Sequence, residues 1–364
     1  MTGLLSVGLA LAGLLHASPP ADPFFERWET LGTAQGLPSK KVLSVLADGP
    51  RVWAGTENGL ALLEGGRVRR VYGAAQGLAV PVVISLAVSP LTGDLWVGTM
   101  GGLARLSGGR IDLFTQLNSG LANDIVYGVA VDGRDVWAAT TAGLSRHDTR
   151  TGAWELFDNT NSIMHEPWGY AITASSGAVY AAVWGGGVLV RDAPGAPFRE
   201  HRDPDGEMEL DMFPDDGLIH DITTSIAYED GVLWAGTYFG LSRYDGKRWR
   251  SYTQDDSGIA GDFINFLRTK GKAVWIATDQ GVSRFDSRVW HTWRRKAGAP
   301  GAELQVVEGG TKTVRALAAG PLSNEVFSVD LDRRGDAWVA TDLGLSHAIA
   351  RRKGQPEAAR RTAQ

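Results

Sequence analysis

The chain has 364 residues, of which 43% are hydrophobic and 21% are charged, with 47 Gly and 13 Trp. This composition fits a foldable globular protein and excludes collagen, a coiled coil and bulk disorder. The sequence contains no Cys, which excludes disulfides, thiolate metal sites, cysteine nucleophiles and a lipid on a leader cysteine, and its net charge of -5 is mild.

The first segment, residues 1–18, is predicted to be a secretory signal peptide. Its uncharged apolar run from Gly3 to Leu15 is too short to span a bilayer as a free-standing helix and lies where an export leader is found. No Lys or Arg precedes the run, and no small-x-small pattern marks a cleavage point. An uncleaved membrane anchor and an internal strand or helix therefore stay open as alternatives. An export leader predicts a periplasmic or secreted protein, which contacts a membrane only if the leader is retained.

One octet recurs through the rest of the chain, with the pattern Trp-x-Gly/Ala-Thr-x-x-Gly-Leu/Val. Its copies begin at Trp53, Trp96, Trp137, Tyr180, Trp234, Trp275 and Trp338. The copy at Tyr180 is degenerate, with Val183 at the Thr position and one extra residue before the Gly. Successive copies lie 41 to 43 residues apart, except for intervals of 54 and 63 residues. A period in the low forties is that of one four-stranded blade, so the sequence predicts an all-β fold: a single seven-bladed β-propeller over residues 24–350.

Within each unit the apolar residues alternate with a period of two, as expected for strands. The octet Trp falls on a central strand, where its ring can fill the wedge between adjacent blades, and the small residue two positions later leaves room for close packing. The Thr hydroxyl can tie the following turn, and the Gly tolerates a positive φ. We therefore expect all seven octets to be structural.

The two ends of the predicted ring differ. The seventh unit lacks an aromatic outer strand, because only the basic residues 351–364 follow it, and these are expected to form a disordered tail. Residues 24–32, FFERWETLG, resemble outer strands such as 248–252. We therefore predict that the N-terminal strand closes the last blade and removes two open sheet edges. The body without the tail is acidic, which argues against nucleic acid as a partner.

The repeats resemble a known family. The Trp-x-Gly-Thr-x-x-Gly-Leu unit is followed by Arg-His/Tyr/Phe-Asp at residues 146–148, 243–245 and 284–286. This combination resembles the two-component-regulator propeller repeats. The resemblance implies a sensor propeller of the kind found in the extracytoplasmic part of histidine kinases, and hence ligand sensing. The chain departs from that pattern because it carries no second propeller and no kinase segment, which puts direct signalling in doubt.

Two insertions are predicted to open on the same face of the ring. The first, 202–221, is rich in Asp and Glu, and Asp203, Asp205 and Glu207 are weak candidates for calcium ligands. Their spacing does not fit an EF-hand loop, and a solvated acidic loop is the alternative. No other cofactor is expected. The second insertion, 294–324, has two β-rich runs around Glu308-Gly309-Gly310 and is expected to project as a hairpin that walls one side of this face.

The candidate ligand site is a group of aromatic residues on this face, around blades four and five. It consists of Trp168, Tyr170, Trp184, Tyr238 and Phe239. Such rings suit sugar faces, peptides or other flat groups. The alternative is that they pack beneath the acidic insertion.

Three carboxylates, Asp124, Asp221 and Asp262, are predicted to begin innermost strands at the channel mouth. They could bind a cation or a hydroxyl-rich ligand. Alternatively, they accept hydrogen bonds from the amides of their own loops.

Enzyme motifs are absent from the sequence: no GxSxG, HExxH, Walker loop or GxGxxG occurs. The sequence predicts an exported, non-catalytic module that binds a carbohydrate, a peptide or an envelope protein through its loop face. A propeller lyase or hydrolase is an alternative, with His220 beside Asp221 and Asp262 as the pair to test. A structural subunit of a cell-envelope assembly is another.

Overall fold

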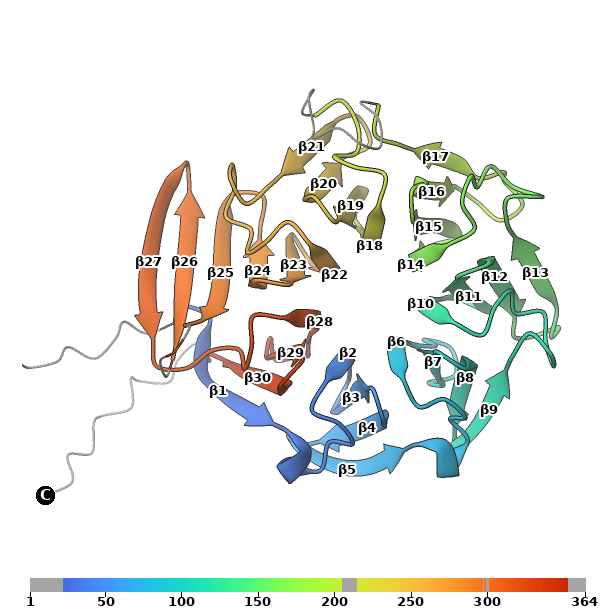
Figure 1. The fold of residues 1–364 in the computed structure, drawn as a ribbon, viewed down its shortest axis with the longest axis horizontal. Helices are drawn as coiled ribbons and strands as arrows, with labels where there is room; N and C mark the ends of the chain where they lie inside the picture. Colours follow the sequence, from blue (N-terminus) through green and yellow to red (C-terminus); the bar gives the residue numbers. More distant parts are fainter. Residues whose placement is uncertain (1–21, 205–214, 297, 299–300, 353–364) are drawn as a thin grey trace, which may run out of the picture.

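A computed structural model describes residues 22–204, 215–296, 298 and 301–352. The described residues form seven antiparallel sheets arranged as blades around a central channel, which Figure 1 shows end-on. The all-β, seven-bladed propeller predicted from the octets is therefore confirmed. The predicted leader, 1–18, lies outside the described residues, and so does the tail beyond Arg352.

The strands of each blade run outward from the channel in chain order. Blades one to three comprise β2 (Val42–Asp48), β3 (Arg51–Thr56), β4 (Gly59–Glu64), β5 (Arg67–Tyr72); β6 (Val83–Val88), β7 (Leu95–Thr99), β8 (Gly102–Ser107), β9 (Arg110–Phe114); and β10 (Val126–Asp132), β11 (Asp135–Thr140), β12 (Gly143–Asp148), β13 (Trp154–Phe157). Short 3-10 turns, η1 (Thr33–Gln35) and η2 (Ala74–Gln76), precede blades one and two.

The remaining blades follow the same plan, with additions in blades six and seven. They comprise β14 (Gly169–Ser175), β15 (Ala178–Val183), β16 (Gly187–Arg191), β17 (Arg199–His201); β18 (Thr223–Glu229), β19 (Val232–Thr237), β20 (Leu241–Tyr244), β21 (Trp249–Tyr252); β22 (Ile264–Lys270), β23 (Ala273–Thr278), β24 (Gly281–Phe285), β25 (Val289–Arg295), β26 (Ala302–Glu308), β27 (Thr311–Leu317); and β28 (Val326–Leu331), β29 (Ala337–Thr341), β30 (Gly344–Ala350), with β1 (Phe25–Leu31).

Strand β1 closes the ring, as predicted. It pairs antiparallel with β30, so that Trp28 lies opposite Ala348 and Leu31 opposite Leu345. Asp22 fixes the start of β1, because its carboxylate accepts hydrogen bonds from the backbone N–H of Phe24 and from the indole of Trp293 in blade six. The last blade thereby acquires its fourth strand from the opposite end of the chain.

The octet Trp residues fill the wedges between blades. Trp53 packs with Val83 and Leu95 of blade two, and each of the other six octets contributes its first ring to a core cluster shared with the next blade. Small residues allow the close approach: a Cβ on Gly55 would lie 2.2 Å from the Ser44 hydroxyl. The core of this protein is therefore a series of seams between blades.

The octet Thr holds the turn that follows it. In six blades its hydroxyl donates to the carbonyl of the octet Gly at 2.8 to 3.0 Å. That Gly has a positive φ, for example 132° at Gly59, where an added Cβ would lie 2.7 Å from the Tyr72 carbonyl oxygen. Only glycine fits such a position.

The hairpin in the second insertion forms, but the expectation that it walls the loop face is wrong. Strands β26 and β27 continue the sheet of blade six beyond β25, and Figure 1 shows them on the outside of the ring. Leu304 of β26 is fully buried beside Trp293 of β25. The apolar residues of the hairpin thus extend an existing sheet outward.

No helix in the described part of the chain is long and apolar enough to cross a membrane.

Candidate functional site

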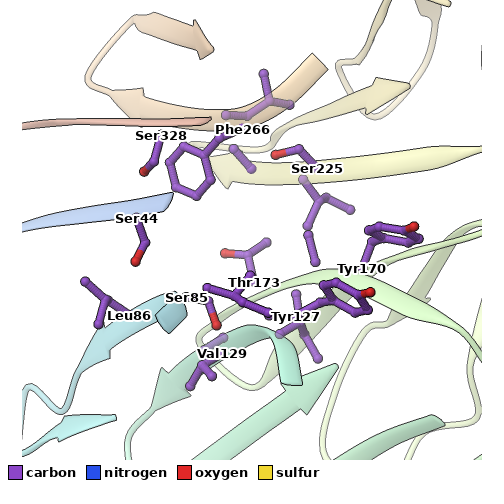
Figure 2. A pocket seen from close by; sticks show the side chains of 18 of the residues that line it. Ser44, Ser85, Leu86, Tyr127, Val129, Tyr170, Thr173, Ser225, Phe266 and Ser328 are labelled. Carbon is purple, nitrogen blue, oxygen red and sulfur yellow. The ribbon is translucent and has the colours of Figure 1, made fainter. Parts of the chain in front are cut away.

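A cavity of about 680 Å³ occupies the centre of the ring. The innermost strands of all seven blades line it, and Figure 2 shows side chains of several of these strands converging on one space. Its described lining residues include no carboxylate and no histidine, and Arg268 is the one permanently charged side chain among them. Arg268 already pairs with Asp330 at 3.2 Å. The wall of the cavity is therefore close to neutral.

A β-bulge at the start of each innermost strand sets which side chains reach the cavity. In every blade the pairing with the second strand shifts between the first and third residues of the innermost strand. A bulge redirects the extra residue out of the regular alternation. The seven residues so placed all line the cavity: Leu43, Ile84, Tyr127, Tyr170, Thr224, Asn265 and Phe327. Blades three and four thus contribute a tyrosine each.

Aromatic rings form a continuous group on one side of the cavity. We call this group the aromatic belt; it consists of Tyr127, Trp168, Tyr170, Trp184, Tyr238 and Phe263. Tyr127 stacks on Tyr170 with ring centroids 4.9 Å apart, and Figure 2 shows the two rings beside each other. Tyr238 stacks on Phe263 at 4.2 Å. The belt therefore reaches from blade three to the start of blade six.

Two tryptophans join these stacked pairs on the loop side. Trp168 stacks on Tyr170 at 5.8 Å, and Trp184 lies 5.4 Å from Tyr170 and edge-on to Tyr238 at 5.1 Å. The backbone N–H of Trp184 donates to the Trp168 carbonyl oxygen, which ties the two segments together. Trp168 is 37% exposed. The belt thus presents ring faces and edges to solvent at the mouth of the cavity.

Four of the five aromatic residues predicted from the sequence lie together in the structure, and the fifth lies apart. Trp168, Tyr170, Trp184 and Tyr238 come together in the belt, where Tyr170 and Tyr238 line the cavity and the two tryptophans do not. Phe239 turns away and packs on the ring of His220, with centroids 4.3 Å apart.

Sequence reasoning missed Tyr127 and Phe263. Tyr127 occupies the same place in its unit as Tyr170, directly after the first residue of the innermost strand. Alignment of the units at this position would have found it.

Tyr127 and Tyr170 are held in the neutral form. Burial raises the pKa of Tyr170 above its ordinary value, and the neighbouring hydroxyls of Tyr238 and Tyr127 raise it further. Burial likewise raises the pKa of Tyr127. The hydroxyls of these two tyrosines thus stay protonated, and they place polar edges beside the stacking faces of the belt.

Polar residues elsewhere on the cavity wall hold neighbouring blades together. The Thr224 hydroxyl donates to the Ile264 carbonyl oxygen of blade six, and the Asn265 amide donates to the Val326 carbonyl oxygen of blade seven. Ser328 accepts a hydrogen bond from the backbone N–H of Val45. These polar groups are therefore occupied by hydrogen bonds between blades. The aromatic belt is the part of the wall best suited to bind a ligand.

The three carboxylates predicted for the channel mouth do not line the cavity. Asp124 accepts a hydrogen bond from the backbone N–H of Gln116 at 2.8 Å, and Asp262 accepts one from that of Gln254 at 2.7 Å. Burial raises the pKa of Asp262. Asp221 is 1% exposed and bonded to the Arg202 guanidinium at 2.7 Å. All three act on their own loops, the alternative considered from the sequence.

Of the residues considered for calcium, only Asp203 falls within the described chain, where it is buried and its N–H donates to Asp221. Asp205 and Glu207 lie outside the described residues. Across 22–204, 215–296 and 301–352, no group of three or more His, Asp or Glu is placed to hold a metal ion. The calcium site stays a prediction.

His220, considered as a base, is 5% exposed. Its Nδ1 accepts a hydrogen bond from the backbone N–H of Ile222 at 3.0 Å, and its ring lies against Phe239. It is absent from the cavity lining. The pairing of His220 with Asp262 considered from the sequence finds no support in these contacts.

The sequence matches no family model and no curated protein. Solved structures are similar. The extracellular domain of a hybrid two-component system from B. thetaiotaomicron has a TM-score of 0.67 and 17% identity, over 90% of this chain and 42% of that one. A second such domain from the same organism has a TM-score of 0.66 and 15% identity, over 88% of this chain and 39% of that one. This chain thus spans less than half the length of these extracellular domains.

Lyases share the fold as well. A streptogramin B lyase has a TM-score of 0.62 and 16% identity, over 90% of this chain and 98% of that one. Virginiamycin B lyase from Staphylococcus aureus has a TM-score of 0.62 and 12% identity, over 89% of this chain and 98% of that one. At these identities the likeness concerns architecture. The resemblance to two-component-regulator propellers, predicted from the repeats, is confirmed at the level of the fold.

Proposed function

We propose that this chain is an exported, non-catalytic binding module whose central cavity takes a neutral ligand with a flat face. The aromatic belt is the observation that carries the proposal. The belt has six rings from four consecutive blades, of which four line a cavity of about 680 Å³ whose wall is close to neutral, while Trp168 and Trp184 pack against those four. Concave, mostly apolar sites with a few oriented polar groups are typical of small-molecule binding.

The chemistry of the belt favours a saccharide or the aromatic side chains of a peptide. Exposed ring faces stack on flat apolar surfaces, and the tyrosine hydroxyls supply hydrogen bonds at their edges. Because the cavity wall carries no uncompensated charge, a neutral ligand avoids the desolvation cost that an unpaired ion would meet there. The extracellular sensor domains that share the fold are consistent with a binding role.

The test is a titration of the purified chain with maltotetraose, cellotetraose, chitotetraose and a neutral Tyr- and Trp-containing peptide, followed by tryptophan fluorescence and calorimetry. We expect at least one of these probes to bind. The double substitution Trp184→Ala with Tyr238→Ala should weaken that binding about tenfold or more, because truncated aromatic hot spots cost about 2 kcal/mol or more.

Leu343→Ala is the matched control. Leu343 occupies the same kind of turn in blade seven, is 48% exposed and does not line the cavity. Its substitution should leave binding unchanged. Binding by the double variant that equals that of the parent would contradict the proposal, and so would the failure of every neutral probe.

The enzyme alternative draws on the fold shared with the lyases. Such a reaction needs a group that can exchange a proton. The ionisable side chains on the described cavity wall are the tyrosines and Arg268. If His220 serves as a base nonetheless, His220→Ala abolishes turnover of a streptogramin and leaves saccharide binding unaffected. If the chain is a structural subunit, neither Trp184→Ala with Tyr238→Ala nor His220→Ala should change its function.

A further inference from the structure

A second cleft, of about 600 Å³, lies where blades six and seven meet. Its wall includes Lys270, the last residue of β22, and Leu331, the last residue of β28. The aromatic belt, in contrast, uses the first residues of the innermost strands. Because the innermost strands all run the same way along the channel, this cleft opens on the face of the ring opposite the belt. It is independent of the proposed cavity site.

The cleft is lined by cations. Lys270, Arg284, Arg351 and Arg352 belong to its wall, which contains no Asp or Glu among the described residues. Arg284 has a partner, since it donates to Asp286 at 2.9 Å and lies over the Phe24 ring at 4.9 Å. For the other three, no carboxylate of the described chain lies within ion-pair distance. Three positive charges thus converge without compensation on a chain that is acidic overall.

Three carboxylates bond residues of the cleft, and each is already engaged; one of them, Asp336, accepts from the Ala350 N–H at 2.9 Å and lies 3.2 Å from His347 Nε2. Asp22 accepts hydrogen bonds from two backbone N–H groups, those of Phe24 and Phe25, and from the Trp293 indole at 2.6 Å. Asp286 accepts from Arg284 and from the backbone N–H of Val289 at 2.9 Å. None of these carboxylates pairs with the three remaining cations, which are exposed and therefore accessible to an anion from outside the chain.

Ring closure holds the cleft in shape. The backbone N–H of Arg351 donates to the Phe24 carbonyl oxygen at 2.8 Å, which continues the pairing of β1 with β30. Trp275 stacks on Trp293 at 5.6 Å and forms an apolar wall together with Phe25. Arg351 therefore leaves the sheet at a fixed point, and it shares the wall of the cleft with Lys270 of the neighbouring blade. The site is built from both ends of the described chain.

We infer that this cleft binds a phosphate group, carried by a monoester or diester with an apolar or neutral body. A phosphate monoester bears a charge of about -1.5 to -2 at neutral pH and has three strong acceptor oxygens, which suits one Lys and two Arg better than a single carboxylate does. Arg binds phosphate through paired N–H groups, and Lys binds it as a point charge. The apolar wall accommodates the group that carries the phosphate.

The test compares two charge-matched triple variants. The first, Lys270→Gln with Arg351→Gln and Arg352→Gln, removes the cations of the cleft. The control, Arg67→Gln with Arg69→Gln and Lys247→Gln, removes three exposed cations from blades one and five that have no ion-pair partner in the described chain. Thermal unfolding and circular dichroism establish that both variants fold like the parent.

Two probes distinguish the sources of phosphate. Inorganic phosphate is titrated by calorimetry at constant ionic strength, and the full chain is sedimented with vesicles of phosphatidylglycerol and, separately, of phosphatidylcholine. Saturable binding of inorganic phosphate indicates a soluble phosphate compound. Binding to phosphatidylglycerol vesicles over phosphatidylcholine, without binding of inorganic phosphate, indicates a lipid headgroup.

In either case we expect the cleft variant to lose about tenfold or more in affinity, while the control variant changes less than about twofold. Equal losses in the two variants would show that the net charge alone matters and would overturn the inference. The absence of parent binding to both phosphate and phosphatidylglycerol would overturn it as well.

Discussion

Blade four and the regular blades form the same turn in different ways. In six blades the octet Thr ties its own turn by donating to the octet Gly carbonyl oxygen. Blade four has Val183 instead, and Thr223 of blade five supplies the hydroxyl: it donates to the carbonyl oxygens of Val183 and Gly187 and accepts from the Val183 N–H. The irregular turn is also the one that brings Trp184 to the aromatic belt.

This difference teaches that the repeat departs from its pattern where the candidate site is built. The extra residue in blade four lengthens its turn, and the neighbouring blade replaces the lost hydrogen bonds. Functional sites commonly break a local rule that the surrounding structure compensates. Six blades share the octet turn that repeats around the ring. Blade four has a different turn, and this turn carries Trp184 of the aromatic belt.

The sharpest test of the comparison is between a core Trp and a belt Trp. Trp96 is 1% exposed and fills the wedge between blades two and three. Trp96→Ala should lower the free energy of unfolding by about 3–5 kcal/mol through the cavity it leaves. Trp184→Ala, which truncates a partly buried ring outside the wedges between blades, should cost less than about 2 kcal/mol. Chemical denaturation of both variants measures the difference. A Trp184→Ala loss as large as that of Trp96→Ala would remove the distinction between scaffold and site.

A smaller effect is expected from the hydroxyl that blade four receives. Thr223→Val leaves buried backbone groups of Val183 and Gly187 without their partner, which should cost about 1–3 kcal/mol. Thr278→Val, which removes the equivalent hydroxyl within blade six, is the matched control and should cost a similar amount. If Thr278→Val destabilises the protein and Thr223→Val does not, blade four needs no replacement hydroxyl.

The smallest effect concerns alkaline pH. Since folding raises the pKa of Tyr127 and Tyr170, it favours their neutral forms. The resulting stabilisation is complete below the ordinary tyrosine pKa of about 10 and is lost as pH rises toward the folded-state values. The double substitution Tyr127→Phe with Tyr170→Phe should therefore flatten the decline in stability above about pH 10. Ultraviolet absorbance of tyrosinate should show two fewer late-titrating groups. If the parent and the double variant show the same number of late-titrating tyrosines, the hydroxyls of Tyr127 and Tyr170 are solvated and this prediction is wrong.

The ring could be predicted from the sequence because its determinants are local and repeated. Each octet carries its wedge residue, its turn hydroxyl and its glycine within eight positions, and the segment at 24–32 matches the strand that blade seven lacks. The hairpin at β26 and β27 was also predictable as a hairpin. The position of the hairpin could not be predicted. The alternation of apolar residues indicates a strand but does not say which sheet edge that strand pairs with, here β25.

The site was predictable only in part. Four belt residues stand out in the sequence because the octet turns and their preceding segment carry few other aromatics. Tyr127 acquires its place from a bulge, which depends on backbone pairing with the next strand. The basic cleft combines residues from blade six with residues from both ends of the described chain. Ring closure brings these residues together, and no single sequence position indicates that they share a cleft.

The pairing of β1 with β30 has a consequence for how the protein folds. The first strand of the ring, β1, finds its partner only in β30, so the ring stays open until β30 has been synthesised. Contacts of such long sequence separation form slowly, and until then the edge of the incomplete wheel is exposed to other chains. Swapping of the first strand between molecules is therefore the assembly error to which this architecture is most vulnerable.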